Sequence, residues 1–177
     1  MNAVISSDAG SAHGQLQHPL ARLNRRLISL FDRIPHSLIA FLGRFSIAAT
    51  FWQSGQTKVE GFAIDLIHGQ FELGMPRLSA SAVDLFRDEY ALPFIPPEWA
   101  AYMAATAEHV FPVLLLIGLG TRYSALALLG MTLVIQTFVY PNAYPTHGMW
   151  AAVLLYLIAR GPGVFSVDHI LSRRLGR

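Results

Sequence analysis

The sequence predicts an all-α protein: a bundle of four transmembrane helices with a long extracytoplasmic loop between helices 1 and 2. Of its 177 residues, 53% are hydrophobic and only 14% are charged, whereas soluble domains carry about 25% charged residues. The stretch from Trp99 to Gly120 is apolar apart from Thr106, Glu108 and His109. Its length of about 22 residues matches the ~30 Å hydrocarbon core of a bilayer. Cysteine is absent, which excludes disulfides and thiolate-bound metal or iron–sulfur centres.

The first 36 residues are expected to form a cytoplasmic tail, with residues 1–20 mobile. Apolar residues between Leu20 and Ile34 recur at steps of three and four and alternate with arginines. This pattern is typical of an amphipathic helix on an anionic leaflet, but a polar extension of the first span fits equally well. No apolar run with a small-residue cleavage site occurs here, so a cleaved signal peptide is not expected.

The first span is predicted from Ser37 to Gly55, interrupted by Arg44. This arginine either extends its long stem to the headgroups or faces the bundle interior and pairs with an acidic group. The following segment, residues 56–97, is polar and broken by glycine and proline. A Ser81–Asp84 capping arrangement predicts a short helix through Tyr90. Such a segment serves as a lid over the bundle or as a folded spacer.

The second span, Trp99–Gly120, is followed by a tight turn, so spans two and three are antiparallel neighbours. Span three is predicted over Tyr123–Tyr140, with Thr121 as its cap. Span four starts near Thr146, and its apolar run ends at Ala159, reaching only about 21 Å. Ser166 and Asp168 are predicted to cap a short terminal helix.

Several of these segments resemble the DoxX family of small four-helix integral membrane proteins. The resembling elements are Arg44 with Gly55 and Lys58, LFRDEYALPFIPPEWAA (85–101) leading into Glu108, LLLIGLGTR (114–122), VIQTFVYP (134–141), His147 with Trp150, and RGPGVFSVD (160–168). The resemblance implies four spans, including the short fourth one. It divides the chain into a cytoplasmic tail (1–36), a DoxX-like membrane domain (37–170) and a basic cytoplasmic C-terminus (171–177). Some relatives are linked to membrane redox systems, including a quinone-reducing thiosulfate oxidation subunit and oxidative-stress complexes.

The candidate intramembrane polar site consists of Arg44, Glu108, Gln136 and His109. Arg44 and Glu108 are predicted to face each other, either as a structural ion pair or as part of a proton- or quinone-handling site. Glu108 and His109 should point about 100° apart on their helix. No metal site is expected. Haem is rejected because His109 and His147 differ in depth by about a dozen ångströms. No catalytic residue is assigned.

Two function classes stay open. One is an accessory subunit of a quinone-linked or oxidative-stress redox system, with no intrinsic cofactor but a bound quinone and a membrane or soluble redox partner. The other is a non-enzymatic scaffold or small-solute carrier. The net charge of +2 gives no indication of nucleic-acid binding. Arginines flank the bundle at both termini, whereas Lys58–Glu98 holds seven acidic and three basic residues. This asymmetry predicts a multi-pass protein of the inner or plasma membrane with both termini cytoplasmic.

Overall fold

The computed structural model describes residues 19–65 and 69–176 and divides into two compact units, residues 1–35 and 36–177. The described part of the first unit, residues 19–35, consists of the helix α1 (Pro19–Phe31) and the turn that follows it. Its Leu23, Leu27, Leu30 and Phe31 side chains are exposed and recur at helical spacing, so the predicted amphipathic helix is present. Its contact with a leaflet stays a prediction. Residues 1–18 of the predicted tail lie outside the described residues.

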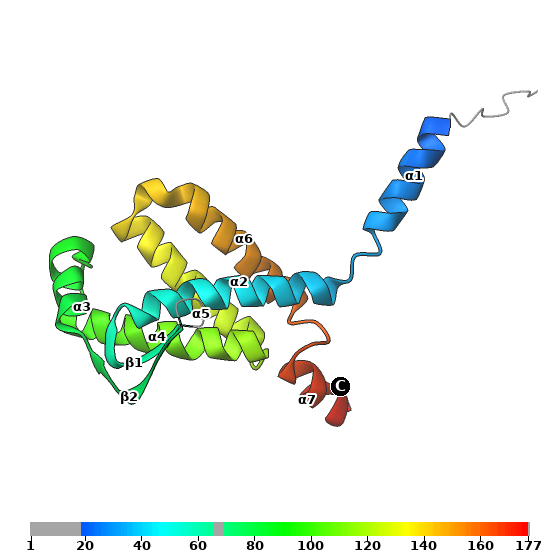
Figure 1. The fold of residues 1–177 in the computed structure, drawn as a ribbon. Coiled ribbons are helices and arrows are strands. Elements are labelled where there is room, and N and C mark those ends of the chain that lie inside the picture. Colours follow the sequence, from blue (N-terminus) through cyan, green and yellow to red (C-terminus); the bar gives the residue numbers. More distant parts are fainter. Residues whose placement is uncertain (1–18, 66–68, 177) are drawn as a thin grey trace, which may run out of the picture. The chain divides into compact units, whose positions relative to one another are not determined.

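Four long helices of the second unit follow the predicted apolar segments (Figure 1). They are α2 (His36–Gln56), α4 (Pro97–Ile117), α5 (Thr121–Val134) with its π-helical extension η2 (Ile135–Val139), and α6 (Tyr144–Arg160). Helix α2 packs on α4, α4 on α5, α5 on α6, and α6 on α2. Their shared core includes Phe51, Leu115, Leu128 and Leu154, one from each helix. A 3-10 turn (Pro141–Ala143) joins η2 to α6, and α7 (Val167–Arg174) follows α6.

Two helices of the described chain are long and apolar enough to cross a membrane: α4, and α5 together with η2. A third crossing is counted if α2 and the helix before it form one bent span. Helix α6 has 17 residues, which is about 26 Å at the helical rise. The protein is therefore mostly helical, with apolar helices of membrane-spanning length. Four crossings stay a prediction.

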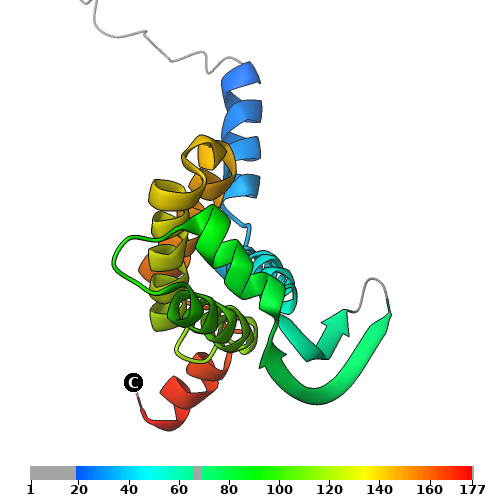
Figure 2. The same ribbon diagram turned by 90° about the vertical axis from the view of Figure 1, so that its left-hand side faces the viewer.

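The segment between α2 and α4 differs most from the prediction. It begins with an antiparallel hairpin, β1 (Val59–Asp65) and β2 (Gln70–Leu78), which projects to one side of the helices (Figure 2). Helix α3 (Ala80–Leu85) and the π-helical turn η1 (Phe86–Tyr90) follow. The predicted helix through Tyr90 is thus present, but its cap is Ser79, whose hydroxyl accepts from the Ala82 N–H at 3.1 Å. The prediction lacked the hairpin because Gly61 interrupts the alternation of apolar and polar residues that marks a strand.

Candidate functional site

A buried ion pair joins the end of α2 to the middle of α4. The Nζ of Lys58, two residues beyond α2, lies 2.7 Å from Oε2 of Glu108. The same ammonium donates to the hydroxyl and carbonyl oxygens of Ser54 at 3.0 and 3.1 Å. The ammonium thus has two hydrogen bonds to Ser54 beside its ion pair with Glu108. The two charged side chains are only 3% and 4% exposed, so each charge depends on the other for its stability.

The predicted pairing of Arg44 with Glu108 is wrong, because α2 and α4 pack in a different register. Gly55, not Arg44, lies level with Glu108: a Cβ added to Gly55 would lie 3.1 Å from the Glu108 Cβ. Arg44 precedes Gly55 by eleven residues, which places it about 16 Å further along α2. The prediction measured depth from the ends of the helices, but α4 begins well beyond the end of α2.

Arg44 instead binds backbone carbonyls at the end of α4. Its Nη1 donates to the oxygens of Leu115 and Leu116 at 3.3 and 2.9 Å, and its Nη2 donates to Phe165 O. Carbonyls in the last turn of a helix lack intrahelical donors and sit at the negative end of the helix dipole. The guanidinium satisfies them and ties the chain after α6 to α4.

The start of α5 is capped from this same junction. The Asp168 carboxylate accepts from the Gly120 and Thr121 N–H groups at 2.8 and 2.9 Å. The predicted capping role of Thr121 is therefore wrong, because a carboxylate at a helix N-terminus satisfies the free N–H groups and complements the dipole. Ser166 caps α7 as predicted, accepting from the His169 N–H at 3.2 Å.

His109, the next residue of α4, belongs to a second series of hydrogen-bonded polar groups. Its Nδ1 bonds to the Ala105 carbonyl at 2.7 Å, and its Nε2 lies 2.8 Å from the Gln56 amide nitrogen. A carbonyl only accepts, so Nδ1 carries the proton and Nε2 accepts from Gln56. The Gln56 oxygen then accepts from the Ile64 N–H of β1 at 2.7 Å. This series of hydrogen bonds fixes the tautomer of His109 and connects α4 through α2 to the hairpin.

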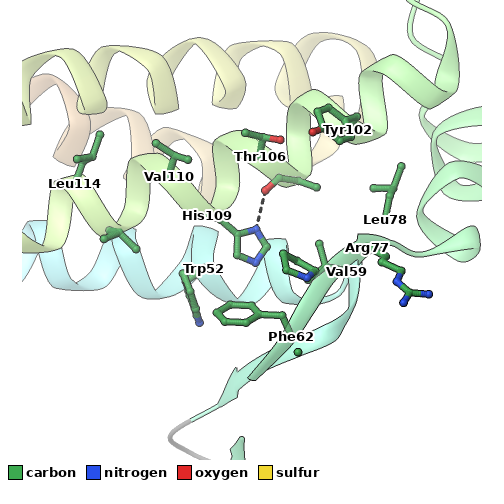
Figure 3. Close-up of a pocket in the computed structure, with 14 residues that line it drawn as sticks. Trp52, Val59, Phe62, Arg77, Leu78, Tyr102, Thr106, His109, Val110 and Leu114 are labelled. Atoms are coloured by element: carbon green, nitrogen blue, oxygen red, sulfur yellow. Dashed lines mark hydrogen bonds between the residues drawn. The ribbon is translucent and has the colours of Figure 1, made fainter. Parts of the chain in front are cut away.

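An apolar pocket of about 660 Å³ opens beside His109, between the hairpin and α4 (Figure 3). Trp52 and Phe62 form an aromatic wall, with the Trp52 and His109 ring centroids 5.1 Å apart. The Trp52 indole N–H donates to the Ile64 carbonyl at 3.0 Å. The opposite wall comes from α4 and includes Tyr102, Thr106, Val110 and Val113. Pockets of this size and lining accept small apolar ligands.

Gln136 lies apart from both Glu108 and this pocket. Its Oε1 accepts from Nδ1 of His147 at 2.7 Å, and its Nε2 donates to the Pro141 carbonyl at 2.6 Å. Gln136 belongs to the π-helical turn η2, so its contacts hold the connection between α5 and α6. The four predicted site residues are thus divided: Glu108 and His109 are neighbours, whereas Arg44 and Gln136 have separate partners.

Sequence reasoning gave no site role to Lys58, Gln56 or Trp52. The available signal was position. Lys58 follows the end of α2 by two residues, and an antiparallel α4 brings an acidic residue past that point. The sequence interpretation paired Glu108 with Arg44 because both lie inside predicted spans at similar estimated depth, whereas Lys58 lies beyond the first span.

A mostly helical chain, with apolar helices of spanning length and buried charges paired between them, indicates an α-helical membrane protein. Comparison with known proteins identifies the kind. Residues 39–141 match the sequence model of DoxX, and the chain belongs to the DoxX family. It is also 31% identical over 100 residues to an uncharacterized protein of Haemophilus influenzae, an alignment that covers 49% of this chain and 64% of that protein. No solved structure matches.

Proposed function

We propose that this protein is an accessory subunit of a membrane redox system and holds a quinone ring in the pocket beside His109. The supporting observation is the pocket itself, which has an aromatic wall, an apolar wall and few polar groups. The proposal includes a multi-pass protein of the inner or plasma membrane with both termini cytoplasmic. Within the same proposal, the redox system is either quinone-linked or an oxidative-stress complex.

The residues of the pocket suit a flat, largely apolar ring. Trp52 and Phe62 offer aromatic surface. The hydroxyls of Tyr102 and Thr106, from α4, are donors of the kind that carbonyl oxygens need. Val110 and Val113 are exposed, so an isoprenoid tail would continue along the apolar outer surface of α4. A bound quinone supplies reversible two-electron chemistry.

The chain's own residues position this ligand. The fixed tautomer of His109 holds its ring against Trp52, and the Lys58–Glu108 pair holds α2 beside α4 directly behind it. The sequence contains no cysteine, and no group of three metal-ligating side chains occurs among the described residues. We therefore assign the supply of electrons to a partner protein, either in the membrane or soluble.

A second candidate function is that of a scaffold or small-solute carrier. It is favoured by the partners that this chain supplies to two buried charged side chains: Lys58 for Glu108 and α4 carbonyls for Arg44. A purely structural role needs nothing more than these contacts.

Ligand binding separates the two functions. With Trp99→Phe and Trp150→Phe in place, Trp52 reports on the pocket alone, because the chain has three tryptophans. We expect decylubiquinone to quench this fluorescence saturably in detergent. Thr106→Phe, which fills the pocket, should weaken binding at least about tenfold, whereas Leu126→Phe, on an exposed position of α5, should not. Identical, non-saturable quenching in all three proteins would favour the scaffold or carrier.

The cellular test uses a deletion strain. We expect an altered redox state of the quinone pool or greater oxidant sensitivity, reproduced by Glu108→Gln in protein that still accumulates. Normal quinone behaviour together with a defect in uptake of a solute would assign the protein to the carrier class.

A further inference from the structure

The hairpin separates its side chains into an apolar and a polar face. Residues opposite each other in an antiparallel pair lie on the same face, and the register gives six such pairs. The apolar face consists of the pairs Phe62–Leu73 and Ile64–Phe71, joined by the pair Val59–Leu78, which lines the same pocket as Phe62. The polar face consists of the pairs Glu60–Arg77, Ala63–Glu72 and Asp65–Gln70. Only Ala63 departs from the separation.

The strand pairing is irregular in the middle of the hairpin. The register shifts between Glu60 and Phe62, where Gly61 has a φ of +79°. There Gly61 alone lies opposite three residues of β2, 74–76, so β2 carries two extra residues and bends. Phe62 lines the same pocket as Val59 and Leu78. Beyond this irregularity, regular pairing places four apolar side chains on one face of the outer half of the hairpin: Phe62, Ile64, Phe71 and Leu73.

The apolar face is covered at one end only. Val59, Leu78 and Phe62 line the pocket against α4. Beyond them, Phe71 and Leu73 are 64% and 79% exposed. Phe71 and Leu73 are thus two large apolar side chains of one strand that nothing in the described part of this chain covers, whereas the other face carries acidic residues. Such a hairpin fits a boundary with an apolar environment on one side and water on the other.

We propose that the hairpin lies at the membrane interface, with Phe71 and Leu73 in the leaflet on its own side of the bilayer and Glu60 and Glu72 in water. Continuity identifies the bilayer as the occupant. The apolar face passes through the pocket to Val110 and Val113, exposed residues of α4, a helix of spanning length. Trp52, whose indole is bonded to β1, is a residue type enriched at this depth. The proposal does not depend on a quinone.

Neighbouring residues on opposite faces provide the test. Because the chain has no cysteine, Leu73→Cys and Glu72→Cys can each be labelled with the fluorophore NBD in the full-length protein. The labelled proteins are reconstituted into phosphatidylcholine–phosphatidylglycerol vesicles that contain lipids with a nitroxide near the top of the acyl chain. We expect blue-shifted emission at position 73 and nitroxide quenching several-fold stronger than at position 72. Leu126→Cys, exposed on α5, serves as a lipid-facing reference.

Two results would overturn the inference. Water-like emission at both positions would mean that the apolar face does not contact lipid. Shielding from aqueous iodide at position 73 without quenching by the nitroxide would mean that protein covers the face, either a partner or a second copy of the chain. If Leu73→Cys fails to fold, Phe71→Cys and Gln70→Cys repeat the comparison with the other neighbouring pair of opposite faces.

Discussion

Lys58 and Glu108 form a buried ion pair at 2.7 Å although one lies beyond the end of α2 and the other is in the middle of α4. Their meeting shows that α4 extends past α2 on the hairpin side. The pair therefore fixes the register of these two helices at the level of the pocket. Arg44 fixes it a second time, through carbonyls at the far end of α4.

The ion pair should be strongly interdependent. Lys58→Met or Glu108→Leu alone leaves an unpaired buried charge and should cost about 3–5 kcal/mol of unfolding free energy. The double variant should recover most of this loss, since both charges are removed together. Unfolding in detergent, analysed as a double-mutant cycle, measures the coupling.

Arg44 provides the matched control for this cycle. Arg44→Leu combined with Glu108→Leu should give additive losses, because Arg44 lies about 16 Å along α2 from Gly55, the residue level with Glu108. Coupling between Arg44 and Glu108 that equals the coupling between Lys58 and Glu108 would contradict the helix register described here.

Close packing at Gly55 should make it intolerant of a methyl group. A Cβ there would lie 2.9 Å from Cε1 of His109, so Gly55→Ala must displace α4 or the His109 ring. We expect a loss of about 1–3 kcal/mol. Gly130→Ala is the control: nothing lies within 4 Å of its added Cβ, and replacing a helical glycine should stabilise α5 by about 0.5–1 kcal/mol. Similar effects of the two substitutions on the unfolding midpoint would contradict the packing at Gly55.

Alanine substitutions at two glycines of the turn between α4 and α5 should distinguish the cost of backbone strain from the cost of steric crowding. Gly118 and Gly120 both have positive φ, +73° and +58°, so alanine is strained at either position by about 1–2 kcal/mol. Only at Gly118 would the Cβ also meet Arg44 Nη1 and Ser166 Cβ, both at 2.5 Å. Gly118→Ala should therefore cost a further ~1–3 kcal/mol and expose α7 to proteolysis. Equal losses at both positions would show that the Arg44 junction tolerates extra volume.

The contact between η1 and the end of η2 should weaken at high pH. Tyr140 donates its hydroxyl to the Glu89 carboxylate, and this bond, with burial and the neighbouring Tyr90, raises the pKa of Tyr140 above its ordinary value. A raised pKa means that the neutral phenol is the form the fold stabilises. The contribution is complete below the unfolded pKa of about 10 and is lost as pH rises through the folded value. The gap in unfolding midpoint between the unaltered protein and Tyr140→Phe should be constant below about pH 9 and close above pH 10. A gap that does not change with pH would argue against this bond.

The orientation can be tested by labelling introduced cysteines. Ala80, at the start of α3, should react with a membrane-impermeant maleimide from outside intact cells after Ala80→Cys, whereas Ser172→Cys in α7 should react only after permeabilisation. This outcome follows from the arginines that flank the spans and the acidic segment between α2 and α4. The opposite pattern would reverse the orientation.

Sequence patterns predicted the helices well because a helix depends on local terms. The apolar runs, the turn after Ile117 and the Ser166 cap are each fixed by residues a few positions apart, through hydrophobic periodicity and backbone satisfaction. These local patterns predict the ends of α2, α4, α5 and α7 to within a few residues. The short α6 also follows its predicted segment, extended at both ends to Tyr144 and Arg160.

Only the tertiary structure decided which groups meet. The partner of Glu108 depends on how far α4 slides along α2, and that sliding is set by close packing at Gly55, which has no periodic signal. The hairpin likewise depends on pairing between β1 and β2 through an irregular stretch, Gly61 opposite residues 74–76, where glycine and proline obscure the strand pattern. The sequence by itself thus determined which segments are apolar helices. The long-range register between segments, which local propensity does not encode, determined the Lys58–Glu108 pair, the pocket beside His109 and the apolar face of the hairpin.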